Sequence, residues 1–268
     1  MSELPPNLRK AVTQEVGPYS QIHALDGVTE LDLNNIEQIT SILEDVHCDA
    51  TRIFTQQFMS MGLAYHAPKF NIRRGIATDL GPCYNPLVET IEVDPHWFSE
   101  QFSQVDSSIW AITLGYVVWH ETGHHVQKLL GYDPEQIDDP EANVEINLKT
   151  VAVELQADCI AGYIIGTKNR EDHDLDNEDT DTAAEDAAGI GDDALARHVG
   201  MRNIPPWFYT HGTSKERRDA ITLGMTLKRL IDVPSLEYFL DISKEIYRRS
   251  LLSKQQAGGL RIGIRVSQ

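Results

Sequence analysis

The strongest constraint on the fold is a proline-free stretch, residues 108–130, in which an apolar run leads into the sequence His-Glu-Thr-Gly-His and which ends at Leu129 and Leu130. Its first half is apolar on almost every side, as in a helix that is buried by several neighbours. Gly131 follows at a position where helices commonly end. Residues four positions apart lie on one face of a helix, so His120 and His124 direct two imidazoles to the same side. The sequence therefore predicts a buried helix that presents a histidine pair.

The residues within this motif suggest metal chemistry. Glu121 lies beside the histidines, where a carboxylate could deprotonate a zinc-bound water. These polar groups follow directly on an apolar run, and buried polar groups need partners, of which a metal ion would be one. Gly123 costs a helix about 1 kcal/mol relative to alanine, a cost that makes sense if another element approaches closely there. The H-E-x-x-H pattern is short enough to occur by chance, so the surrounding sequence must decide whether it marks a metal site.

A second helix, predicted over residues 147–167, supplies the missing ligand. Catalytic zinc sites usually combine three protein ligands with one water. Glu154 and Asp158 are the only acidic residues of this segment and lie four apart, on one face. We expect Glu154 to be the third ligand and Asp158 to hydrogen-bond the far nitrogen of a ligand histidine. The alternative, a solvated acidic stripe, is less favoured because residues 157 and 159–161 are apolar or small.

Five sequence blocks together resemble the bacterial neutral zinc metallopeptidase family. The two main blocks are residues 120–127 and 154–162, and residues 190–193, 209–217 and 81–94 add to them. The resemblance spans roughly residues 80–226. It implies an α+β fold, a mainly helical zincin-like domain of the minimal gluzincin kind, with a small, mostly antiparallel sheet over the active-site helix.

The same resemblance implies roles for individual residues. His120, His124 and Glu154 would hold one catalytic Zn²⁺, and Glu121 would be the general base. In zincins an edge strand lies above the active-site helix, and an extended substrate could add to it through main-chain hydrogen bonds. Residues 71–78 and 89–94 have partial strand character, although a sheet that merely covers one helix face is equally compatible with them.

Residues 213–216, Thr-Ser-Lys-Glu, have the form of a capping box, so a helix is predicted to begin near Ser214 and to run through Leu230. His211 would lie in the loop before it and could donate a hydrogen bond to the oxyanion of a tetrahedral intermediate. Tyr209 is a further possible donor. An ordinary loop histidine is the alternative, and it is the resemblance that favours a role for His211 near the site.

Arg217 lies in the first turn of this predicted helix. We expect its guanidinium to pair with Glu154 or Asp158 and so to support the metal ligands without touching the metal. The adjacent Arg218 is the alternative candidate for this role.

Composition limits the classes of partner. The chain has 268 residues, 41% of them hydrophobic, and a net charge of −18, which argues against nonspecific nucleic-acid binding and against docking on anionic lipid. Residues 171–193 contain eleven Asp or Glu residues and no Lys or Arg. We interpret residues 168–181 as an acidic insertion between helices, with a helix resuming over 182–199. A calcium loop of the EF-hand type is disfavoured because Asn177 stands where such a loop needs glycine.

The ends of the chain complete a single predicted domain, residues 1–268. Long helices are expected over 34–61 and 235–252, and the tail from residue 255 is expected to be a short strand or disordered. The first residues do not resemble a signal peptide, and no apolar span of 18 residues exists, so we expect a cytoplasmic protein without an integral membrane span. The resembled family commonly carries an N-terminal membrane anchor, so this is a departure from it.

The three cysteines are too few and too scattered for a disulfide framework and are expected to be free thiols: Cys48, Cys83 and Cys159. Cys83 also precedes the histidine motif, and a thiolate upstream of H-E-x-x-H is the third ligand in peptide deformylases. The other sequence signatures of that fold are absent, so Glu154 remains the better ligand.

Taken together, these patterns favour a zinc metallopeptidase, a hydrolase that attacks peptide or protein substrates with a metal-activated water. Two alternatives from other classes stay open. One is a non-catalytic scaffold with a structural zinc, whose four protein ligands would include His125 or His211. The other is a metal-free helical interaction protein. The sequence specifies neither the substrate nor the oligomeric state.

Overall fold

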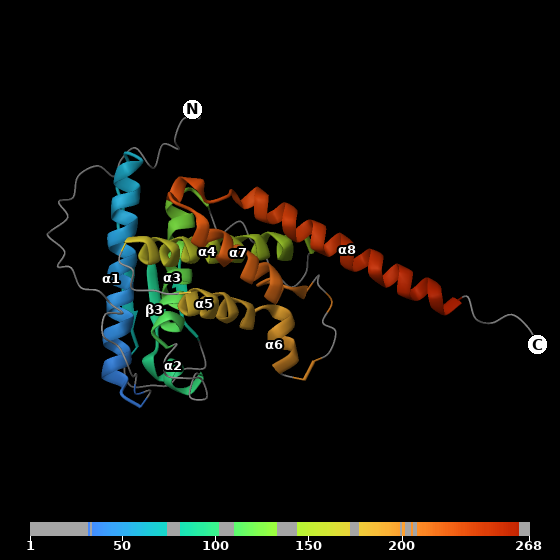
Figure 1. Ribbon diagram of the computed structural model, residues 1–268, viewed down its shortest axis with the longest axis horizontal. Coiled ribbons are helices and arrows are strands. Elements are labelled where there is room, and N and C mark those ends of the chain that lie inside the picture. The colour runs from blue at the N-terminus through green and yellow to red at the C-terminus, as the bar shows by residue number, and fades with distance from the viewer. Residues whose placement is uncertain are drawn as a thin grey trace, which may run out of the picture.

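Helices make up most of the protein, and one small sheet lies beside them (Figure 1). The computed structural model describes residue 32 and residues 34–73, 81–101, 110–132, 144–171, 177–198, 200–201, 205 and 208–262. The helices in these ranges are α1 (Ile36–Ser60), α2 (Pro95–Gln101), α3 (Trp110–Leu129), α4 (Val144–Glu171), α5 (Asn177–Gly189), α6 (Asp192–His198), α7 (Ser214–Thr226) and α8 (Leu236–Ile262). The predicted α+β class is confirmed.

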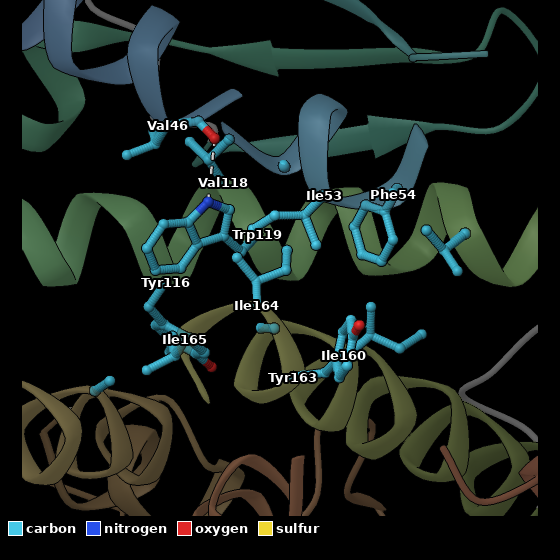
Figure 2. Close-up of a cluster of buried hydrophobic side chains, with 14 of the residues drawn as sticks. Val46, Ile53, Phe54, Tyr116, Val118, Trp119, Ile160, Tyr163, Ile164 and Ile165 are labelled. Atoms are coloured by element: carbon cyan, nitrogen blue, oxygen red, sulfur yellow. Dashed lines mark hydrogen bonds between the residues drawn. The ribbon is translucent and has the colours of Figure 1, made fainter. Parts of the chain in front are cut away.

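The core is built around α3, which lies between α1 and α4 (Figure 2). Its Trp119 is fully buried, and the indole N–H donates to the carbonyl oxygen of Val46 on α1 at 3.1 Å. On the opposite side α4 contributes the apolar side chains of Ile160, Tyr163, Ile164 and Ile165. A helix that is apolar almost all round, as the sequence predicted, is therefore covered on both sides.

The sheet has three strands, β1 (Lys69–Ile72), β2 (Cys83–Asn85) and β3 (Thr90–Val93), in the order β1-β3-β2. β2 pairs with β3 antiparallel, whereas β1 pairs with β3 parallel. The expected mostly antiparallel sheet is thus a mixed one, because the chain enters β3 in the same direction as β1. β2 is an edge strand and lies against α3. Residues 74–80, which the sequence also suggested as strand, lie outside the described residues.

α4 also packs closely along α7. A Cβ atom at Gly162 would lie 2.1 Å from the carbonyl oxygen of Ile221, and one at Gly224 would lie 2.0 Å from that of Cys159. Only glycine leaves room for two backbones at this separation. This approach brings the first turn of α7, with Arg217, over the middle of α4. α8 packs across α4, and its C-terminal end extends away from the other helices (Figure 1).

The start of α7 confirms the predicted capping box: the hydroxyl of Thr213 accepts from the backbone N–H of Glu216, whose carboxylate accepts from the N–H of Thr213. The helix ends at Thr226, before the predicted Leu230, because Leu227 has an extended backbone. Leu230 instead belongs to a short 3₁₀ helix and is buried. α8 continues to Ile262, beyond the predicted end at residue 252 and into the tail that was expected from residue 255, because residues 253–257 are mostly good helix formers. Residues 263–268 lie outside the described residues.

The predicted acidic insertion at 168–181 must be corrected at both ends. α4 continues to Glu171 and α5 begins at Asn177, so only residues 172–176 lie between them, and these are outside the described residues. The predicted helix over 182–199 is divided into α5 and α6, because the chain turns at Ile190–Gly191. A Cβ at Gly191 would lie 2.3 Å from the backbone nitrogen of Ser214, so this turn sits against the start of α7. No described helix combines the length and apolar character that crossing a bilayer requires.

Lys168 explains why α4 continues where a loop was expected. Its ammonium group lies 2.6 Å from the Asp49 carboxylate on α1, and the two side chains are 0% and 3% exposed. We expect Lys168→Met to lower the free energy of unfolding by about 3 kcal/mol, the low end of the range for a broken buried pair. The Asp49 carboxylate would keep only its longer contact, 3.9 Å, with the partly exposed Arg52. Denaturant unfolding monitored by circular dichroism measures this loss.

The matched control is Lys149→Met, which removes an exposed i,i+4 pair with Glu145. Such surface pairs contribute at most about 0.5 kcal/mol. The double variant Lys168→Met/Asp49→Leu should recover much of the loss, since neither charge then remains in the core. Equal stabilities of the two single variants would contradict this account.

Asp186 makes stability depend on pH. Burial is the main reason why its pKa is raised to about 6, and the hydroxyl of Thr113 donates to it at 2.6 Å. Because the folded protein holds this proton more tightly than the unfolded chain, the stabilisation is complete below about pH 4 and is lost as the pH rises through 6. Asp186→Asn should therefore raise the free energy of unfolding by about 1–2 kcal/mol at pH 7.5, with the shift discounted for partial exposure.

At about pH 3 the difference between this variant and the parent should nearly vanish, because the Asp186 carboxyl is then largely protonated in both the folded protein and the unfolded chain. Thermal unfolding at both pH values measures it. A constant difference at the two pH values would exclude Asp186 as the titrating group.

Candidate metal centre

Two histidines of α3 and one glutamate of α4 converge on one point. Potential ligand atoms of His120, His124 and Glu154 all lie within 4.8 Å of one another, and within the described ranges no other group of three or more His, Cys, Asp and Glu side chains is so arranged. The Glu154 carboxylate oxygens lie 3.2 Å from His120 Nε2 and 3.5 Å from His124 Nε2. This arrangement is a possible metal-binding triad.

The convergence depends on the close approach of α3 and α4 at the motif itself. A Cβ atom at Gly123, between the two histidines, would lie 2.9 Å from the carbonyl oxygen of Ala157 and 3.0 Å from its Cα. The sequence predicted that a neighbouring element comes very close to this glycine, and the structure has α4 in that place. This close approach brings the α4 turn that carries Glu154 and Asp158 against the histidine pair.

A buried network orients His120. The carboxylate of Asp158 lies 2.8 Å from His120 Nδ1 and also accepts from the Tyr116 hydroxyl at 2.9 Å. Arg217 of α7 donates to both oxygens of Asp158, each at 2.8 Å, and lies 3.9 Å from Glu154. With the proton of Nδ1 directed to Asp158, the other ring nitrogen of His120 is left facing the triad.

These contacts set the charges in the pocket. Burial would raise the pKa of Asp158, but the charge of Arg217 and the hydrogen bond to His120 outweigh it and hold that pKa below its usual range. The pKa of Glu154 is likewise low, because the two imidazoles and Arg217 outweigh the effect of burial. Burial disfavours the imidazolium of His120, yet Asp158 and Glu154 raise its pKa to about 10 in the metal-free protein. The pocket therefore attracts positive charge.

His124 has a hydrogen-bond partner of its own in Gln127, whose carboxamide oxygen lies 3.0 Å from His124 Nδ1. The Gln127 amide nitrogen in turn donates to the carbonyl oxygen of Val153 at 2.8 Å and to Gln156 at 3.0 Å. Sequence analysis gave Gln127 no role. Its position three residues after His124, on the same helix face, is the pattern that could have indicated one.

Glu121 is buried beside the triad and is held from the opposite side, by the sheet. Its carboxylate accepts a hydrogen bond from the backbone N–H of Tyr84 on β2 at 2.7 Å. Burial raises the pKa of Glu121 above its usual value, although the neighbouring His120 and His124 act in the opposite direction. A buried carboxylate with a raised pKa is a suitable proton acceptor near neutral pH.

His211 lies in the loop before α7, half-exposed, and is held by Asp192. One Asp192 oxygen accepts the backbone N–H groups of Thr210, His211 and Gly212, and the other lies 3.1 Å from His211 Nδ1. This hydrogen bond is the main cause of the raised pKa of His211, and the charge of Glu154 adds to it. Asp192 was noted at the sequence level only as part of the resembling block at 190–193.

Three residues that the sequence offered as alternative metal ligands or as the alternative arginine lie away from the triad. Both ring nitrogens of His125 have protein partners away from the triad. Cys83 is exposed on β2 and is not part of the converging group. Arg218 pairs with Glu185 near the surface.

The donor set fits zinc. Two imidazole nitrogens and one carboxylate oxygen are ligands that Zn²⁺ takes in catalytic sites. Each histidine also has an outer partner on its other nitrogen, Asp158 for His120 and Gln127 for His124. Such partners fix the tautomer and the ring orientation of metal ligands.

Fold and site together define an α+β protein with a possible three-ligand metal centre between two long helices. Residues 11–229 match the family described as "Putative neutral zinc metallopeptidase", and the chain belongs to that family.

The curated relatives are themselves uncharacterized proteins. YpfJ of Escherichia coli strain K12 is 36% identical over 172 residues, which cover 60% of this chain and 59% of YpfJ. Rv2575 of Mycobacterium tuberculosis strain H37Rv is 33% identical over 158 residues, which cover 55% of this chain and 52% of the relative. The matches thus span between half and three fifths of these relatives. No solved structure matches the chain significantly.

The contact at Gly123 can be tested by Gly123→Ala. The added methyl group would meet backbone atoms of Ala157, which cannot rotate away, so α3 and α4 must separate. We expect a loss of about 1–3 kcal/mol in the free energy of unfolding. We also expect about tenfold weaker Zn²⁺ binding in competition with a chelator.

Gly189→Ala is the matched control, because Gly189 also lies in a helix but has no atom within 4 Å of the new Cβ. Gly189→Ala should leave the free energy of unfolding and the affinity for Zn²⁺ nearly unchanged. If Gly123→Ala behaves like this control, helix separation does not govern the site.

Proposed function

We propose that the protein is a zinc-dependent peptidase of the gluzincin type, in which His120, His124 and Glu154 hold one catalytic Zn²⁺ and Glu121 is the general base. The observation that carries the proposal is the convergence of the three side chains with the buried Glu121 carboxylate beside them. Membership in a family described as zinc metallopeptidases supports it. Contacts of both α1 and α8 with the central α3–α4 pair favour one domain.

A zinc ion bound by this triad would supply two effects: a water pKa lowered to about 7 and a polarised peptide carbonyl. The residues of the chain do the rest. Glu121 accepts a proton from the attacking water and returns it to the leaving amine, for which its burial and raised pKa suit it. Asp158, with Arg217 behind it, keeps His120 in one tautomer.

His211 is proposed to stabilise the developing oxyanion. Its Nδ1–H is directed to Asp192, and in the imidazolium form, which the raised pKa of His211 favours, Nε2–H can donate to the substrate. The electrostatic influence of Glu154 on His211 is consistent with a position near the triad. A positioned donor of this kind acts most strongly on the charge of the transition state.

Substrate is proposed to be a peptide or protein segment that binds in extended form along β2. In the pairing of β2 with β3, Tyr84 stands opposite Ile91, and its N–H is directed to Glu121, away from β3. The outer edge of β2 therefore borders the catalytic carboxylate. Because Glu121 already accepts from the Tyr84 N–H, a substrate would pair with the main-chain groups of this edge that remain. Main-chain addition of a substrate to such an edge is a recurrent mode of peptide binding.

A structural zinc site is the second candidate function and has less support. Four protein ligands would be needed to close it. His125 donates from Nε2 to the carbonyl oxygen of His66 and accepts at Nδ1 from Tyr84, so it has no nitrogen left for a metal. A buried Glu121 would also have no purpose in such a site.

Glu121→Gln is the decisive variant. It should bind about one equivalent of zinc, as the parent does, and lose turnover by about 10²–10⁴-fold, because only the proton acceptor is removed. Incubation with a proteome-derived peptide library, followed by mass spectrometry, measures the products with and without chelator.

Glu245→Gln, an exposed carboxylate on α8 that pairs with Arg249, is the matched control and should cleave like the parent. The proposal fails if Glu121→Gln and the parent yield the same products at the same rate, or if chelator leaves the products unchanged.

A further inference from the structure

Tyr84 of the edge strand β2 contacts the Glu121 carboxylate through its main-chain amide. Its side chain has a separate hydrogen-bond partner. The backbone N–H of Tyr84 donates to Glu121 at 2.7 Å. Its side-chain hydroxyl lies 2.9 Å from His125 Nδ1, and the two rings meet edge to face with centroids 5.4 Å apart. Tyr84 therefore links Glu121 to the histidine that follows the metal-binding motif.

The protonation of this link follows from its partners. His125 Nε2 lies 2.8 Å from the carbonyl oxygen of His66, which can only accept, so Nε2 carries the proton. Nδ1 is then an acceptor in the neutral ring, and the Tyr84 hydroxyl must be its donor. Each group is thus either the donor or the acceptor at each step of the hydrogen-bonded series that leads from His66 to Glu121.

A second contact holds the turn that follows β2. Lys128, three residues after His125 and on the same face of α3, donates to the carbonyl oxygen of Pro86 and lies 2.9 Å from Glu89. His66 also contacts Glu89, at 3.2 Å. α3 therefore presents the two histidines of the triad on one face and anchors the edge strand with another.

We propose that His125 and Tyr84 are positioning residues, which together hold the Glu121 carboxylate in its working orientation through the Tyr84 amide. The inference rests on the proposed function and adds residues that take no part in binding the metal. A glutamate side chain has several rotatable bonds, and a donor fixed by the sheet removes that freedom. Misplacement of a reacting group by about 1 Å can cost about 10²-fold in rate.

Tyr84→Phe tests the link with little disturbance, because the ring and its packing on His125 remain and only the hydroxyl is lost. We expect kcat to fall about tenfold on the peptide that the parent cleaves best in the library, the effect of about one hydrogen bond. KM should stay within about twofold and the zinc content should be unchanged. The melting temperature should fall by only about a few degrees, the effect of one buried acceptor left without its donor.

His125→Gln should have the same effect as Tyr84→Phe. Its amide can still donate to the His66 carbonyl, but it offers no acceptor at the position of Nδ1. The double variant should be no slower than either single variant, because both changes cut the same link. Tyr65→Phe is the matched control, since Tyr65 also packs edge-on against His125, with centroids 6.0 Å apart, and should keep the parent kcat.

Combining Tyr84→Phe with Glu121→Gln distinguishes an effect of Tyr84 on Glu121 from a general structural effect of Tyr84. If Tyr84 acts through Glu121, the residual rate of Glu121→Gln in long incubations should not fall further. A further tenfold fall would overturn the proposal, as would a parent-like kcat in both Tyr84→Phe and His125→Gln while Glu121→Gln is inactive. Full activity of Glu121→Gln would instead reject the peptidase mechanism itself, so the two failures are distinguishable.

Discussion

The buried contact between Arg217 and Asp158 joins the three helices on which the site depends. Arg217 comes from α7, Asp158 from α4, and the same carboxylate holds His120 of α3. Two opposite charges in an apolar interior are tolerated only when each is fully paired, and the two parallel hydrogen bonds at 2.8 Å meet that requirement. The position of the histidine relative to α4 and α7 follows from this contact.

α3 has two functional faces with different neighbours. The face with His120 and His124 meets α4, and Gly123 allows the backbones to touch there. The face with His125 and Lys128 meets β2 and the turn after it. Glu121 lies where the two environments meet, with the triad on one side and the Tyr84 amide on the other. A site of this kind needs both neighbours, because neither alone defines where the carboxylate lies.

Several elements were predictable because their causes are local. The apolar run before His120 predicted a buried helix, and Thr213 with Glu216 predicted the start of α7. Errors arose where distant contacts override local preference. Lys168 belongs to a helix because its ammonium group pairs with Asp49, which lies more than a hundred residues away in the sequence. The parallel pairing of β1 likewise depends on the path of the chain and not on the residues of the strand.

The sequence by itself determined which chemistry is available: two histidines one helical turn apart, a carboxylate between them, and a second helix with Glu154 and Asp158 four apart. Helical periodicity is a property of neighbouring residues, so it can be recognised without coordinates. Only the tertiary structure decided that Asp192 holds His211 and that Tyr84 holds Glu121. Both contacts join segments that are distant in sequence, and the second uses a backbone amide, which every residue except proline possesses, so residue type could not reveal it.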